Sequence, residues 1–143
     1  MPCTNPPILD IADEIVTIIN DGELCIETTA ERVYIHHERI SQIGTDLKVW
    51  VQPIEDQITI LTRASDYHTY IIDIGILKKC KTDLEVDDVM AISWAIYELL
   101  KRYQYTDGGK TLSVTMPTLY SPDYLNAQNL FAGFITVEIV DKN

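Results

Sequence analysis

Positive charge is scarce in this chain of 143 residues and absent from residues 1–31. Eleven Lys and Arg residues stand against 22 Asp and Glu residues, which gives a formal net charge of −11. A surface this negative repels phosphate backbones and anionic lipid headgroups. The composition therefore argues against a nucleic-acid-binding or membrane-binding protein, but it suits a protein that DNA passes without sticking.

Cysteines and long apolar runs are also few. Cys3, Cys25 and Cys80 form an odd, widely spaced set, which fits reduced cytosolic thiols better than a disulfide framework or a metal knuckle. No apolar run approaches the ~20 residues that span a bilayer. The first residues lack the charged start and apolar stretch of a secretory signal. The length and composition predict a single globular domain over residues 1–143.

Two amphipathic helices are predicted. Asn5 followed by Pro6 has the pattern of an N-cap with proline at the first helical position, and isoleucines recur at helical spacing up to Gly22. A second helix is expected from Thr82 to Tyr103, because Thr82 and Glu85 fit a capping box and Lys101 with Arg102 occupies the last turn.

Alternating apolar residues predict the strands. The runs lie at 31–37, 47–52, 58–62, 67–77, 112–116 and 130–140, with turns expected at Glu55-Asp56 and near Ala64, and a polar loop from Pro117 to Gln128. The run 67–77 is apolar on both faces near Ile72, as in an interior strand. The fold class is therefore α+β, with a mixed, mainly antiparallel sheet of about five to six strands packed against two main helices.

Catalytic and metal-binding motifs fail their structural tests. Gly109-Lys110-Thr111 ends like a phosphate-binding loop, but the expected order is helix, turn, strand instead of strand, loop, helix. His36 and His37 point to opposite faces of a strand, so the two side chains do not converge on one metal ion. Paired carboxylates such as Asp13 and Glu14 are expected on a solvated helix face. We expect no enzyme, no metal and no cofactor.

Aromatic residues indicate a contact surface instead. Trp50 falls on the strand face opposite Val49, and Tyr120 and Tyr124 lie in a polar loop. Exposed Trp and Tyr are enriched at protein interfaces, so these three residues are the candidate interface. The alternative is that a helix covers Trp50 and that both tyrosines anchor their loop.

The order of elements resembles the tail-terminator proteins of long-tailed bacteriophages, also called tail-completion or head–tail joining proteins. The resemblance rests on an opening amphipathic helix, the strand AERVYI, the run LKVWVQP, and DYHTYIIDIGILKK followed by the helix LEVDDVMAISWAIYELLKRY. A closing strand, LFAGFITVEIV, follows a loop that contains Pro and Tyr.

The resemblance implies a structural virion protein without catalytic residues, assembled in the host cytoplasm. Such proteins form a ring, usually a hexamer, at the head-proximal end of the tail tube, where they end polymerisation and join the tail to the head. The partners implied are other copies of the chain, the tail tube protein and a head-completion or connector protein. DNA passes through the ring without specific binding.

Two alternatives stay open. The first is another neck component, such as a head-completion or connector protein. The second is a small ligand-binding α+β domain with a pocket near His36, His68 and the second helix.

Overall fold

The computed structural model describes residues 3–22, 30–34, 43–101, 103–106 and 109–142. In chain order these residues form α1 (Pro7–Asp21), β1 (Ala30–Arg32), β2 (Lys48–Thr62), β3 (Ser65–Lys79), α3 (Asp83–Leu100), β4 (Lys110–Thr118), α4 (Pro122–Gln128) and β5 (Leu130–Lys142). His36, His37, Cys25 and Arg102 lie outside the described residues, as do residues 35–37 of the strand predicted at 31–37.

The described strands form one sheet in the order β1-β2-β3-β5-β4. β1 pairs with β2 in parallel, and the other three pairings are antiparallel. The predicted α+β class with a mixed, mainly antiparallel sheet is confirmed. The prediction of an interior strand is also confirmed, because β3 is the central strand and both Ile72 and Ile74 are fully buried on it.

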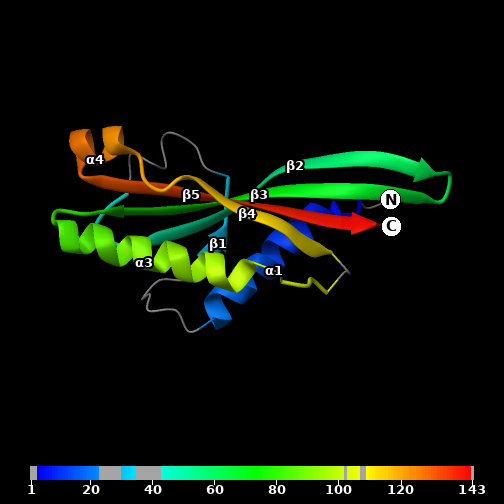
Figure 1. Ribbon diagram of the computed structural model, residues 1–143, viewed down its shortest axis with the longest axis horizontal. Helices are drawn as coiled ribbons and strands as arrows, with labels where there is room; N and C mark the ends of the chain where they lie inside the picture. Colours follow the sequence, from blue (N-terminus) through cyan, green and yellow to red (C-terminus); the bar gives the residue numbers. More distant parts are fainter. Residues whose placement is uncertain (1–2, 23–29, 35–42, 102, 107–108, 143) are drawn as a thin grey trace.

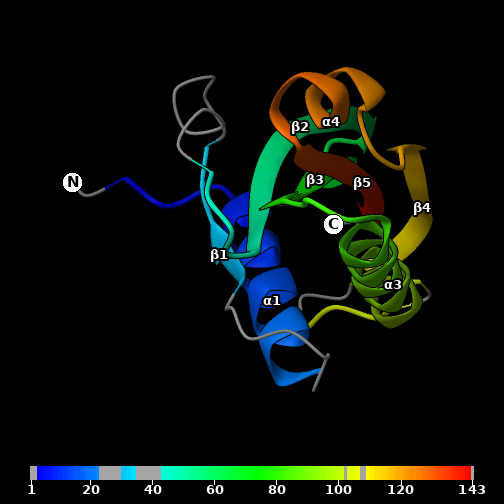
Figure 2. The same cartoon turned by 90° about the vertical axis from the view of Figure 1, so that its left-hand side faces the viewer.

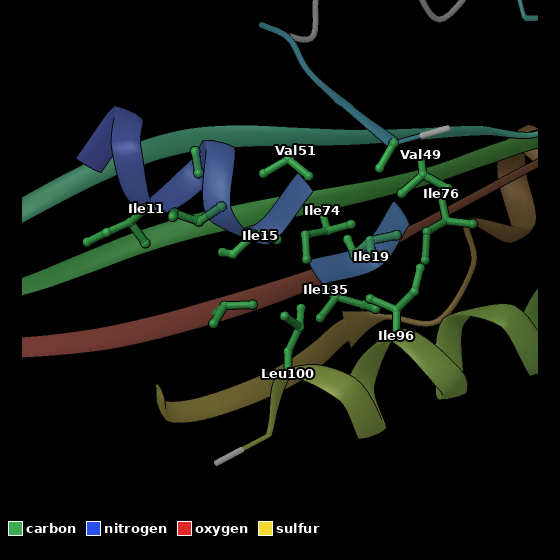
Figure 3. Close-up of a cluster of buried hydrophobic side chains, with 14 of the residues drawn as sticks. Ile11, Ile15, Ile19, Val49, Val51, Ile74, Ile76, Ile96, Leu100 and Ile135 are labelled. Carbon is green, nitrogen blue, oxygen red and sulfur yellow. The ribbon is translucent and has the colours of Figure 1, made fainter. Parts of the chain in front are cut away.

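Helices α1 and α3 lie on the same face of the sheet, α1 against β1 and β2 and α3 against β5 and β4 (Figures 1 and 2). Between helices and sheet lies a core made largely of isoleucine (Figure 3). The labelled residues are Ile11, Ile15, Ile19, Val49, Val51, Ile74, Ile76, Ile96, Leu100 and Ile135. Each such side chain contributes roughly 1.5–3 kcal/mol when it is removed from water.

The helix ends follow the local sequence signals with small shifts. The N-cap of α1 is Pro6, one residue after the predicted Asn5, and Pro7 begins the helix. The predicted cap of α3 is confirmed, because the Thr82 hydroxyl accepts the Glu85 N–H at 3.3 Å. The helix ends at Leu100, before the predicted Tyr103, because Lys101 has an extended ψ of 131°.

Two predictions about loops are wrong. The expected turn at Glu55-Asp56 is absent, because β2 continues through Pro53 with a register shift between Pro53 and Glu55. Proline is tolerated there because this part of β2 has no described strand on its other side. The expected loop from Pro117 to Gln128 contains the end of β4 and the helix α4, which Ser121 caps and which ends at Asn129 with a φ of 53°.

Candidate interaction surfaces

The three predicted interface residues do not form a free aromatic surface, because Trp50 and Tyr124 belong to a second small core and Tyr120 packs against the main core. Trp50 is only 5% exposed and packs in a second small core with Ile43, Leu77, Leu130 and Ala132, so the expectation that it is exposed is wrong. The reason is that Tyr124, on the unpredicted helix α4, packs against this second core.

The two tyrosines mainly anchor their segment. Both are half-buried. The Tyr120 ring stacks on Phe131, with centroids 6.1 Å apart. Tyr124 packs against the core that holds Trp50. Both side chains are therefore used within the monomer, as in the alternative considered for them.

A β-hairpin formed by the far halves of β2 and β3 is the most prominent surface feature. Residues 54–68, which we call the arm, project from one end of the sheet (Figure 1). β1 pairs with β2 only as far as Val51, and β5 pairs with β3 only from Tyr67 onward. Within the described residues, the β2 edge of the arm therefore has no strand beside it, and such an edge is a template for contact with another chain.

Apolar side chains cover this arm. Ile60 is 75% exposed and Ile58 is 57% exposed, and Ile54 and Leu61 are also exposed. An exposed cluster of large aliphatic residues on a protruding strand marks an interaction site. The alternating sequence pattern predicted a strand here, but it did not predict that the apolar side chains of this strand are exposed to solvent.

Side-chain contacts within the arm stabilise its hairpin conformation. His68 Nδ1 lies 3.0 Å from Asp56 Oδ1 on the neighbouring strand, and the His68 ring stacks on Tyr70 with centroids 5.5 Å apart. At the tip, the Thr62 and Ser65 hydroxyls are 2.9 Å apart, and Thr62 also accepts the Ala64 N–H. These contacts hold the hairpin in a defined shape before any partner binds.

A second exposed surface lies on the outer side of α3. Trp94 is 55% exposed, and Leu84 is exposed in the first turn of the same helix. The Trp94 ring contacts the Tyr97 ring, with centroids 4.9 Å apart, and Lys101 lies over Tyr97. Sequence reasoning missed Trp94, although Trp94 lies outside the apolar stripe that the helix buries.

The sheet face opposite α1 and α3 is polar and acidic beyond the second core. Cross-strand register places Gln52, Asp73 and Thr136 side by side on three adjacent strands. The Thr136 hydroxyl donates to Asp73 Oδ1 at 2.8 Å. Glu55 and Glu138 both pair with Ile71 in the neighbouring row. A strand face of this kind offers hydrogen bonds and negative charge.

The residues considered for chemistry have structural roles. Asp13 pairs with Arg32 at 2.7 Å, and Glu14 accepts the Thr106 N–H at 3.1 Å, so both carboxylates tie α1 to other elements. Burial raises the pKa of the Cys80 thiol, which keeps it in its unreactive form. Burial also raises the pKa of Tyr105 to about 12, and its hydroxyl lies 3.1 Å from the Thr111 hydroxyl.

The phosphate-loop pattern does not form in this fold. Lys110 and Thr111 are the first residues of a β-strand, as the predicted order of elements required. An open depression of about 360 Å³ is lined by Tyr103, Gln104, Lys110 and Thr111. Across the described part of the chain, no three His, Cys, Asp or Glu residues converge on a possible metal position.

The described helices include none with the length and hydropathy needed to cross a bilayer. No protein-family model and no curated protein matches this chain.

Proposed function

We propose that this chain is a phage tail terminator, a structural protein that forms a ring at the head-proximal end of the tail tube. One structural observation supports the proposal most strongly: the arm presents exposed Ile54, Ile58, Ile60 and Leu61 on an edge that no described strand covers. A surface of this kind favours contact with another chain.

The order of sequence elements supports the same function. The runs that resemble the tail-terminator family fold into consecutive parts of one sheet: AERVYI includes β1, LKVWVQP begins β2, and DYHTYIIDIGILKK is most of β3. The acidic helix start that follows is the capped first turn of α3. The resemblance therefore concerns the elements that build the sheet and its covering helix.

The charge of the chain is compatible with a passage for DNA. A net charge of −11 and an acidic sheet face repel a phosphate backbone. DNA would then move through a ring of these chains without specific binding. The remaining partners in this proposal are the tail tube protein on one side and a head-completion or connector protein on the other.

Electron microscopy of tail tubes tests this function. The tube protein of the same phage is polymerised with and without the purified chain. We expect tubes that stop growing and carry an added ring at one end. Tubes that elongate equally in both samples would contradict the proposal. Binding to DNA-filled heads in place of tubes would favour the neighbouring neck component instead.

A matched pair of arm variants makes the experiment specific. Ile60→Asp places a charge on the exposed apolar side of the arm, and Thr59→Asp places the same charge on the adjacent exposed residue, which faces the other way. We expect Ile60→Asp to lose capping and Thr59→Asp to retain it.

A further inference from the structure

We propose that the arm of one copy packs against the outer side of α3 in the next copy, with Ile60 opposite Trp94 and Arg63 opposite Asp87. This inference deepens the proposed function and rests on it, because it names the contact that joins neighbouring copies. The occupant of both exposed surfaces is thus a second copy of this chain.

The two surfaces lie on separate parts of the molecule. The arm projects from one end of the sheet, and α3 runs under the other end and the centre (Figure 1). The end-on view also places β2 and α3 on opposite sides of the molecule (Figure 2). A chain with two different exposed apolar surfaces joins its copies head to tail, and such an interface either closes into a ring or grows into a filament.

The two surfaces also carry complementary charges. Arg63, at the exposed tip of the arm, is the only Lys or Arg between Val49 and Leu77. Its guanidinium makes no ion pair with any residue that the structure describes. Asp87 and Asp88 are exposed in the first turns of α3. The cation of the arm therefore meets an acidic part of α3 when the two surfaces join.

Each surface carries its charged residue close to its apolar anchor. Arg63 lies in the turn at the tip of the arm, directly after β2 ends at Thr62, and Ile60 precedes it by three residues. Asp87 precedes Trp94 by seven residues, which is about 10 Å and close to two full turns along a helix, so both side chains lie on one side of it. A charged residue and an apolar residue are therefore available on each surface for the same contact.

Trp94 supplies the anchor of this contact. Its ring is held against Tyr97, which lies under Lys101, and Lys101 in turn pairs with Glu98 at 2.7 Å. A tryptophan already fixed by its neighbours loses little conformational freedom on binding, and aromatic residues of this kind dominate interface energies.

Cysteine crosslinking tests the contact. Cys3 and Cys25 are first replaced by serine, which leaves only Cys80, and Cys80 is buried. One chain then receives Arg63→Cys and a second, larger tagged chain receives Asp87→Cys, so that Ile60 and Trp94 stay in place. After mild oxidation of the mixture we expect a mixed dimer that neither chain forms alone. Arm-to-arm dimers of the Arg63→Cys chain, or rings without any mixed dimer, would overturn the inference.

A charge exchange gives an independent measurement. Arg63→Glu and Asp87→Lys should each raise the concentration needed for assembly by roughly two- to fivefold, as expected for an exposed ion pair. The double variant should restore the original concentration, since the pair is re-formed with reversed signs. If the double variant instead needs a still higher concentration for assembly than either single variant, the proposed pairing of Arg63 with Asp87 is contradicted.

The failure of this inference is distinguishable from that of the proposed function. A chain that caps tail tubes but gives no mixed crosslink keeps its function and loses this contact. A chain that gives the mixed crosslink but leaves tube growth unchanged has the contact and is not a terminator. Trp94→Ala should weaken assembly on the order of thirtyfold, whereas unchanged assembly would count against the contact.

Discussion

His68 and Asp56 face each other across the two strands of the arm, with Nδ1 and Oδ1 3.0 Å apart. The imidazole side chain is 12% exposed and the carboxylate is 24% exposed, so the pair is partly shielded from water. Asp66 lies on the other side of the ring, 4.0 Å from Nε2. These contacts fix the hairpin where it leaves the rest of the sheet.

Removal of the imidazole nitrogens should loosen the arm. His68→Phe keeps an aromatic ring against Tyr70 but leaves Asp56 without its partner, and a hydrogen bond to a charged group contributes roughly 1.5–3 kcal/mol. We expect faster amide hydrogen exchange in residues 57–66 and little change in α1. His68→Gln, which retains a donor, is the control. Equal exchange in the arm of all three proteins would show that the pair does not hold it.

Asn20 should be important for the edge of the sheet. Its side chain accepts the Ala30 N–H at 2.7 Å and donates to the Ala30 carbonyl at 3.2 Å, which joins the end of α1 to the start of β1. Asn20→Ala leaves both backbone groups without this partner, so we expect a loss of about 1–3 kcal/mol of unfolding free energy.

Chemical denaturation measures this loss. Thr17→Ala is the matched control, because Thr17 on the same helix only donates to the exposed Asp13 carbonyl. Its unfolding free energy should change by less than about 0.5 kcal/mol. Equal effects of the two substitutions would contradict the role given to Asn20.

Among Gly22, Gly44, Gly109 and Gly133, a methyl group would lie closest to a neighbouring atom at Gly133. A Cβ there would lie 2.4 Å from the Leu119 carbonyl oxygen and 3.0 Å from the Phe131 ring. Gly133→Ala should therefore destabilise the protein by roughly 1–3 kcal/mol through overpacking. Gly44→Ala, where nothing lies within 4 Å, should be neutral or slightly stabilising. Thermal unfolding of both variants checks this difference, and equal melting temperatures would contradict it.

Tyr105 should make stability depend on pH in the alkaline range. Burial raises its pKa to about 12 from the ordinary phenol value of 10.0. The folded state therefore favours the protonated phenol, and its contribution is complete below pH 10 and lost as the pH rises toward 12. A shift of this size corresponds to roughly 2–3 kcal/mol.

The variant Tyr105→Phe isolates that contribution. It removes the titrating hydroxyl, so the fall in unfolding free energy between pH 10 and 12 should become smaller than in the original chain. Denaturation at several pH values measures the two slopes. Identical slopes would mean that Tyr105 does not titrate differently in the folded and unfolded states.

Local signals predicted the parts of the fold that depend on neighbouring residues. The Thr82 cap and the isoleucine stripe of α1 were readable because a helix cap and an amphipathic face are set within a few turns. The length of β2 was not readable, because Pro53 is tolerated only where the strand is an edge. Likewise, the insertion of β5 between β3 and β4 depends on long-range pairing.

The sequence predicted a contact surface without catalytic residues, but not which residues form it. An alternating strand shows which face Trp50 occupies, but not that Tyr124 and the second core cover that face. Trp94 could have been found, because it lies outside the buried stripe of its helix. The arm could not have been found from the sequence, since the exposure of Ile58 and Ile60 depends on where the neighbouring strands end.

The mass of the assembled protein in solution tests the central claim most directly. Light scattering over a wide concentration range, on the chain alone and in the presence of tail tubes, should find one discrete closed species several times the mass of the monomer, and Trp94→Ala should shift it toward the monomer. A chain that stays monomeric under both conditions, or that grows into filaments of unlimited length, would contradict the account of a ring.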